Sequence, residues 1–120
     1  METILMGTAS AASGSGRDNT YLLLRVADDC TLIDVGGNPL GKLKTLNIST
    51  HHIKRVLLTH VHIDHIYGLP SLLWGMWLDH RTEPLVLCCH QCDLAWIEQW
   101  LAHLRMSSWP ATIRGSTPAV

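Results

Sequence analysis

The segment from Thr59 to His65 restricts what this chain can fold into more than any other, because it holds three histidines and one aspartate within six residues. It follows an apolar run expected to form a buried strand. His60 and His62 keep the two-residue period of an extended chain, so both imidazoles can point to one side. Two such imidazoles suit a divalent metal such as zinc. Asp64 and His65 come where the chain turns into a helix, and they direct a carboxylate and a third imidazole at a neighbouring point.

The motif therefore predicts two adjacent metal positions. Two metals about 3.5–4 Å apart form a clamp suited to activating water against an ester. The alternative interpretation is a cluster of surface histidines in a loop. Burying four titratable side chains beside an apolar strand is costly unless they are paired or bound to metal. The spacing is also far more restrictive than a lone pair of histidines, so the metal site is the favoured interpretation.

Strands and helices are expected to alternate along the chain, which favours an α/β (α+β) fold with helices packed against a sheet. Strands are expected at residues 3–6, 20–26, 30–35, 53–58 and 84–89, and helices at about 39–48, 65–78 and 93–104. Residues 7–19 are rich in glycine, serine and alanine and predict a loop. Residues 106–120 lack acidic residues and periodicity, so we expect a folded part over residues 1–105 and an irregular tail over residues 106–120.

The length of 120 residues corresponds to one small domain. A composition that is 47% hydrophobic and 16% charged is typical of a globular protein. The net charge of -1 counts against a non-specific nucleic-acid-binding protein, although an enzyme could still grip RNA at one small patch. No apolar run approaches the ~20 residues needed to cross a bilayer, and no signal peptide is visible. The expected location is the cytoplasm.

The cysteines are poorly placed for disulfide bonds, because neighbouring cysteines on a strand point to opposite faces. A closed zinc site is also not expected, since the single Cys-x-x-Cys pair has no second pair to complete four ligands. We expect reduced thiols, with Cys88 and Cys89 as small apolar strand residues. The helical segments carry Trp74, Trp77, Trp96 and Trp100 at spacings of three and four residues, which predicts core or half-core packing.

The sequence from Thr59 to Pro70 resembles the metal-binding signature of the metallo-β-lactamase superfamily. Three more segments match in order: Gly7-Thr8 with residues 17–20, the Asp-x-Gly segment at residues 32–36, and the strand at residues 84–87. The Gly-Leu-Pro after the motif and the Gly-Thr…Arg-x-Asn opening resemble the ribonuclease Z branch and its cyclic-phosphodiesterase relatives. The resemblance covers roughly residues 3–104.

This resemblance implies a four-layer αββα sandwich built from two similar halves, with a dinuclear zinc site between them. His60 and His62 would bind the first metal, and Asp64 and His65 the second, with Mn²⁺ or Fe²⁺ as alternatives to Zn²⁺. Asp64 would also be the catalytic proton acceptor. Asp34 would orient a metal-binding histidine; its alternative role is that of a turn residue at a strand end.

The resemblance also implies ligands that this sequence lacks: a third histidine on the first metal, a bridging aspartate and a last histidine. Asp93 and His103 are expected to be capping or solvent-facing residues of a helix and do not replace them. The 120 residues supply about half of the implied domain, so we expect only its N-terminal half, as a truncated product or a fragment. The exposed half-sandwich face is expected to associate with a second copy.

Three functions remain open from the sequence. The first is a zinc-dependent hydrolase of the ribonuclease Z type, which would process the 3′ end of precursor tRNA. The second is a small-substrate hydrolase of the same fold, acting on a cyclic phosphodiester, a thioester or a lactam. The third is a non-catalytic remnant that binds metal weakly or associates with another chain.

Overall fold

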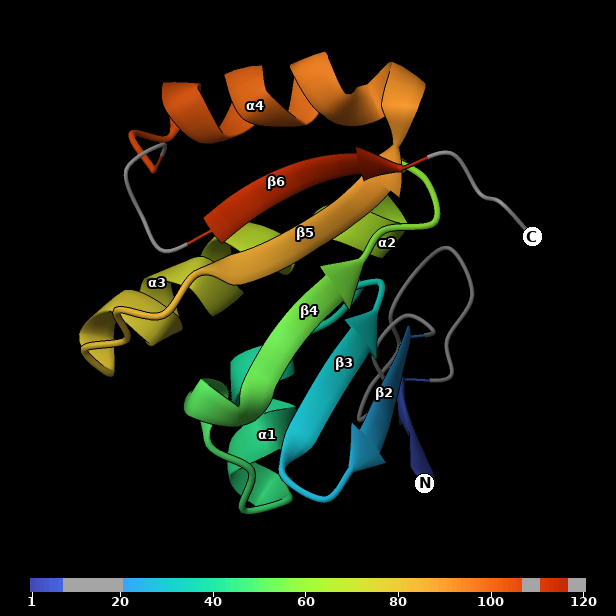
Figure 1. Cartoon of the computed structure of the whole chain (residues 1–120), viewed down its shortest axis with the longest axis vertical. Helices are drawn as coiled ribbons and strands as arrows, with labels where there is room; N and C mark the ends of the chain where they lie inside the picture. Colours follow the sequence, from blue (N-terminus) through green and yellow to red (C-terminus); the bar gives the residue numbers. More distant parts are fainter. Residues whose placement is uncertain (8–20, 107–110, 117–120) are drawn as a thin grey trace.

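A computed structural model describes residues 1–7 and 21–106, together with the backbone of residues 111–116 (Figure 1). These residues form a six-stranded sheet whose order in space follows the order in sequence. Most of the loop expected at residues 7–19 lies outside the described residues. The strands are β1 (Glu2–Gly7), β2 (Tyr21–Val26), β3 (Asp29–Ile33), β4 (Ile53–Leu57), β5 (Leu85–His90) and β6 (Ala111–Ser116).

The strands run in two senses. β2 pairs antiparallel with both β1 and β3, whereas β4 lies parallel between β3 and β5, and β6 lies parallel beside β5. The carboxyl ends of β3, β4 and β5 therefore meet at one edge of the sheet, where open α/β sheets bind their ligands. The α/β prediction is confirmed.

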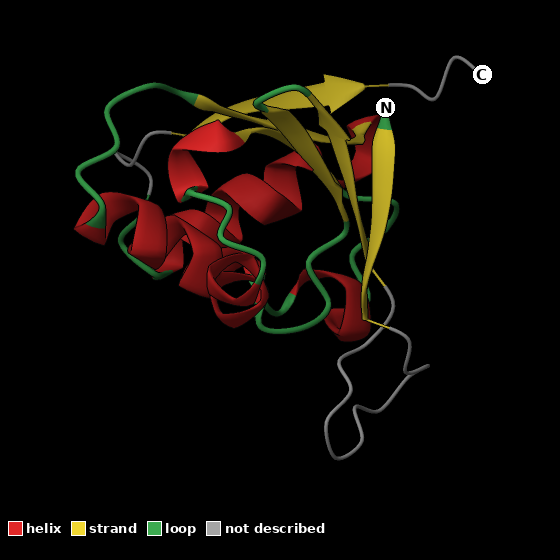
Figure 2. Cartoon of the chain, turned by 90° about the horizontal axis from the view of Figure 1, so that it is seen from below, coloured by secondary structure: helices red, strands yellow, loops and turns green. Residues whose placement is uncertain are grey.

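The helices gather on one side of the twisted sheet (Figure 2). They are α1 (Pro39–Thr45), α2 (Ile63–Ile66), α3 (Leu69–Leu78) and α4 (Leu94–His103), with 3₁₀ turns at Thr50–His52 and Gln91–Asp93. α1 begins as expected: the side chain of Asn38 accepts a hydrogen bond from the Gly41 amide, and Pro39 follows it. Within the described part of the chain, no helix is long and apolar enough to span a membrane.

The single helix expected at residues 65–78 is wrong, because the structure divides it into α2 and α3. Pro70 explains the division. A proline inside a helix clashes with the carbonyl four residues earlier, whereas the first turn tolerates it. The structure places Pro70 in the first turn of α3, after a break at Tyr67 and Gly68.

One face of the sheet packs against the helices. Cross-strand neighbours Leu23, Leu32, Val56 and Leu87 form a row on this face, and all four are fully buried. Their burial follows from the alternation of side chains along each strand. The helices contribute Leu43, Leu72, Leu73, Met76, Ile97 and Leu101 to the same core.

The other face carries a second apolar row that we call the open row: Leu5, Leu22, Ile33, Leu57 and Cys88. These five residues are cross-strand neighbours on β1 to β5. Leu5 is 56% exposed and Leu57 is 41% exposed, while the other three are half-buried. The sheet thus has one buried face and one accessible face, on which the open row lies beside the polar residues Thr31 and Arg55.

The expectation of an irregular tail is wrong for residues 111–116, which form β6. Its register runs from Leu85 opposite Ala111 to His90 opposite Ser116. Periodicity gives no signal here, but the edge of β5 offers unpaired backbone groups, and pairing satisfies them. The remaining residues of the tail, 107–110 and 117–120, lie outside the described part.

The core or half-core packing expected for the tryptophans is found at Trp100, whereas the other three are exposed. Trp74, Trp77 and Trp96 are 49%, 51% and 46% exposed, and Trp100 is half-buried against the core. Their helical spacing brings the two tryptophans of each helix together. The rings stack in pairs, with centroids 5.3 Å apart in Trp74–Trp77 and 5.4 Å apart in Trp96–Trp100.

Candidate metal centre

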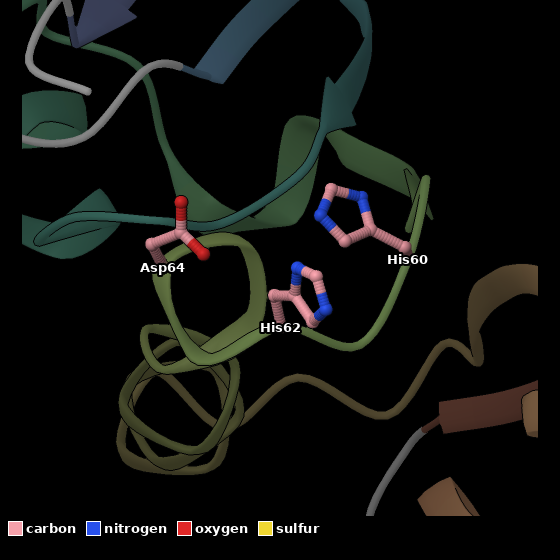
Figure 3. A group of neighbouring side chains, drawn as sticks. All are labelled: His60, His62 and Asp64. Carbon is pink, nitrogen blue, oxygen red and sulfur yellow. The ribbon is translucent and has the colours of Figure 1, made fainter. Parts of the chain in front are cut away.

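The loop after β4 and the start of α2 bring three candidate ligands together (Figure 3). His60 and His62 come from the loop, and Asp64 comes from the first turn of α2. One ligand atom from each of these side chains lies within 4.8 Å of the others. His60 and Asp64 are half-buried and His62 is exposed, so the cluster opens to solvent. These three side chains are among the four that the sequence motif singled out.

His65 stands beside this cluster. Its Nε2 lies 3.4 Å from Oδ2 of Asp64, and its ring centroid lies 3.9 Å from that of His60. The ring of His60 in turn lies edge-on to that of His62, with centroids 4.6 Å apart. The four residues predicted from the motif therefore form one continuous group of nitrogen and oxygen donors.

Asp34 is the buried residue that holds this group to the sheet. It follows β3, is 5% exposed and has a φ of 66°, a left-handed conformation that aspartate tolerates better than most residues. Its Oδ1 accepts a hydrogen bond from the Thr59 amide at 2.8 Å. Its Oδ2 lies 2.8 Å from the Thr59 hydroxyl and 2.9 Å from Nδ1 of His65. The histidine that Asp34 contacts directly is thus His65.

Backbone hydrogen bonds fix the same two segments to each other. The Asp34 amide donates to the Leu57 carbonyl at 2.8 Å, and the Val35 amide donates to the His65 carbonyl at 2.9 Å. The Gly68 amide donates to the Val35 carbonyl, also at 2.9 Å. A Cβ on Gly68 would lie 2.4 Å from the Gly37 oxygen and 2.6 Å from the Val35 oxygen, so only glycine allows this approach. The glycine of the Gly-Leu-Pro sequence therefore closes the loop around Asp34.

The donor set fits a divalent transition metal. Imidazole nitrogen and carboxylate oxygen are ordinary zinc ligands, and they also suit manganese and iron. Two ligands on one zinc at about 2.1 Å are at most about 4.2 Å apart. The three donors lie within 4.8 Å of one another, which is only slightly wider than this limit.

Three other side chains with possible ligand atoms lie apart from this group. Asp93 precedes α4 without making a capping hydrogen bond from its side chain, and His103 is exposed at the end of that helix. His90 accepts a hydrogen bond from the Cys92 amide through Nδ1. None of the three joins the metal cluster found among the described residues. Thr59 is a site residue that the sequence reasoning missed, although it opens the motif.

Comparisons with known proteins identify the family and the fold. The model of the family described as Anti-Pycsar protein Apyc1 matches residues 1–107. The chain belongs to this family. Ribonuclease Z from Methanothermobacter thermautotrophicus is 34% identical over 85 residues, which cover 71% of this chain and 28% of that protein. Ribonuclease Z from Thermococcus sibiricus is 30% identical over 101 residues, which cover 84% of this chain and 33% of that protein.

Solved structures show that the fold is that of the metallo-β-lactamases. YhfI from Bacillus subtilis matches with a TM-score of 0.82 and 18% identity, over 98% of this chain and 46% of that chain. The short form of human tRNase Z matches with a TM-score of 0.79 and 21% identity, over 100% of this chain and 46% of that chain. Zn²⁺-bound PqqB from Methylobacterium extorquens matches with a TM-score of 0.73 and 16% identity, over 98% of this chain and 50% of that chain. The chain thus spans half or less of each protein named here.

Proposed function

We propose that this chain carries metal-binding residues of a zinc-dependent hydrolase that cleaves phosphodiesters. The observation that supports it is the gathering of His60, His62 and Asp64 at the carboxyl edge of the sheet. The chain's membership of the metallo-β-lactamase superfamily and its ribonuclease Z relatives add to this support. A surface histidine cluster would not require the buried Asp34 that holds His65 in place.

Each of the four residues has a role in this proposal. His60 and His62 bind the first zinc ion, and Asp64 and His65 bind the second, with Mn²⁺ or Fe²⁺ as alternatives. When bound, the two ions supply Lewis acidity, which lowers the pKa of water from about 15.7 towards ~7 and neutralises charge on a phosphoryl oxygen. Asp64, half-buried and next to Nε2 of His65, is the proton acceptor.

The leading substrate in this proposal is precursor tRNA, cut at its 3′ end, because the curated relatives are ribonucleases Z. A small cyclic phosphodiester is the second candidate. Two observations favour it: the net charge of -1 offers no basic excess for RNA, and the family that matches residues 1–107 bears a different name. Cleavage of precursor tRNA, of a cyclic nucleotide and of a chromogenic phosphodiester, measured side by side, distinguishes the two.

Metal analysis tests the proposed site directly. The purified 120-residue chain should bind zinc, and the double variant His60→Ala/His62→Ala should lose most of it. A matched control is His51→Ala/His52→Ala, which removes two histidines outside the cluster. Equal zinc content in all three proteins would contradict the proposed metal site.

Turnover is the second test. Catalytic zinc sites keep three protein ligands, whereas the motif offers two for each ion. We therefore expect the 120-residue chain to bind metal but to cleave very slowly. A fusion that adds the remaining part of a related ribonuclease Z should cleave phosphodiesters in a chelator-sensitive way, and Asp64→Ala should abolish that activity. Rapid cleavage by the 120-residue chain itself would instead mean that other side chains complete the site.

We further propose a cytoplasmic location and self-association. The four cysteines are all free in the structure, which fits a reducing compartment. The open row is apolar across five strands, and extended apolar patches are uncommon on monomers. A second copy of the chain packing face to face would cover it.

A further inference from the structure

The hydroxyl of Thr59 lies between the buried carboxylate and the first histidine of the motif. Its Oγ1 is 2.8 Å from Oδ2 of Asp34 and 3.1 Å from Nδ1 of His60. The amide of the same residue donates to Oδ1 of Asp34, which fixes the backbone of Thr59 independently of its side chain. The hydroxyl is thus a bridge that the backbone already holds in position.

The direction of these hydrogen bonds follows from the donors available. A carboxylate oxygen without a proton only accepts, so the single hydroxyl proton of Thr59 points to Asp34. The hydroxyl oxygen then offers its lone pair to His60, and a bond at 3.1 Å requires a proton on Nδ1. The neutral ring of His60 therefore carries its proton on Nδ1, and Nε2 keeps the lone pair that a metal needs.

The same carboxylate oxygen also contacts His65, the last histidine of the motif. Oδ2 of Asp34 also accepts from Nδ1 of His65, which leaves Nε2 of His65 facing Asp64. Histidines that bind metals commonly donate their other nitrogen to such a partner, which sets both tautomer and orientation. Asp34 thus reaches one imidazole directly and the other through the Thr59 hydroxyl.

We infer that Thr59 is a positioning residue for the metal centre: its hydroxyl fixes the tautomer and the orientation of His60. The inference rests on the proposed function for its purpose, but the tautomer exists in the metal-free chain. Thr59 touches neither substrate nor metal in this inference and acts only through His60. The hydroxyl also couples the proposed first metal position to the second, because both depend on one oxygen of Asp34.

The tautomer is measured first, by ¹⁵N NMR of the imidazoles in the metal-free chain at about pH 8, where an ordinary imidazole is neutral. His60 should show a proton on Nδ1. The preference of His60 for a proton on Nδ1 should be lost in Thr59→Val and retained in Thr59→Ser. His62 makes no hydrogen bond with the described residues through its ring and serves as the internal reference. Unprotonated Nδ1 in the unsubstituted chain would overturn the inference even if Thr59→Val failed to fold.

Metal affinity is measured second, by zinc titration of the same three proteins. Thr59→Val should bind zinc at least about tenfold more weakly, as expected when an outer partner of a ligand is removed, and Thr59→Ser should bind normally. Equal affinity in Thr59→Val and the unsubstituted chain would overturn the inference. Absence of zinc binding by the unsubstituted chain would contradict the proposed function alone, since the tautomer test would still decide the role of Thr59.

Discussion

Nδ1 of His65 donates a hydrogen bond to Oδ2 of Asp34 across 2.9 Å, and the two residues are 31 positions apart in the sequence. This bond ties the metal-binding loop to the end of β3. Asp34→Asn should weaken it, because an amide has a single acceptor oxygen, whereas three donors now surround the carboxylate. Asparagine tolerates the left-handed backbone at this position, so the effect should come from the side chain.

The expected result for Asp34→Asn is a loss of about 1–3 kcal/mol in the free energy of unfolding and about tenfold weaker zinc binding. Urea unfolding and zinc titration measure the two effects. Asp29→Asn is the matched control, because Asp29 forms an exposed ion pair with Arg55 that should contribute little. If the two variants lost the same free energy of unfolding and the same zinc affinity, the role assigned to Asp34 would be wrong.

Gly68→Ala should destabilise the chain and weaken metal binding together. The new Cβ would meet two backbone oxygens of residues 35 and 37, which cannot move without displacing the turn that follows Asp34. Overpacking of this kind costs about 1–3 kcal/mol. Gly75→Ala is the control, since the atoms nearest to its Cβ would belong to the Leu40 side chain, which can move more easily than backbone. Thermal unfolding should show a clearly larger loss for Gly68→Ala than for Gly75→Ala.

Arg81→Met should destabilise the fold without altering the metal site. The buried guanidinium donates to the carbonyls of Thr50, Ile53, Glu83 and Pro84, at the amino ends of β4 and β5. Burial lowers the pKa of Arg81, and the four carbonyls compensate for the loss of water. Loss of these four hydrogen bonds should lower the free energy of unfolding by about 3 kcal/mol or more. Zinc affinity of the folded variant should remain unchanged, because the metal-binding loop lies at the other edge of the sheet.

Alkaline pH should destabilise the chain through two thiols. Burial raises the pKa of Cys30 and of Cys89, so the folded chain holds these protons more tightly than the unfolded chain does. The stability that the two protonated thiols contribute is therefore complete below the ordinary thiol pKa of ~8.5. It is lost as pH rises through the raised pKa values of the folded chain. Urea unfolding at about pH 7.5 and pH 10 measures the loss. Cys89→Ala should reduce this dependence, and Cys92→Ala, which removes an exposed thiol, should leave it intact.

Self-association should depend on the open row. Leu57→Lys places a charge in the middle of this row and should shift the sedimentation profile towards the monomer. Leu46→Lys is the matched control, because Leu46 is 38% exposed at the end of α1, away from the row. Monomeric behaviour of the unsubstituted chain at every concentration tested would contradict association through this face.

The grouping of the candidate metal ligands could be predicted from the sequence because these residues are local. His60, His62 and Asp64 lie within five residues, and a strand followed by a helix turn is enough to bring them together. The link between Asp34 and the loop was expected only through a family resemblance, since no local pattern joins residues so far apart. Thr59 was missed because its role depends on where the carboxylate of Asp34 lies.

The wrong predictions share a physical cause. Helical spacing shows that Trp74 and Trp77 are on the same side of a helix, but it does not show whether that side meets the sheet. β6 was missed because its pairing with β5 is a long-range contact that leaves no periodic signal. The single helix expected at residues 65–78 ran through Pro70, whereas the structure starts a new helix there.

The contiguity of the metal-binding loop has a thermodynamic consequence. A ligand that binds only the folded state at about 100 times its Kd raises the free energy of unfolding by about 2.7 kcal/mol. His60 and His62 remain neighbours when the chain unfolds, so the unfolded ensemble retains part of the affinity and reduces this gain. The contacts with Asp34 and the backbone bonds beside them are specific to the folded state. The rise in Tm on adding zinc should therefore measure how much of the zinc affinity depends on the contacts between the loop and Asp34 at the end of β3.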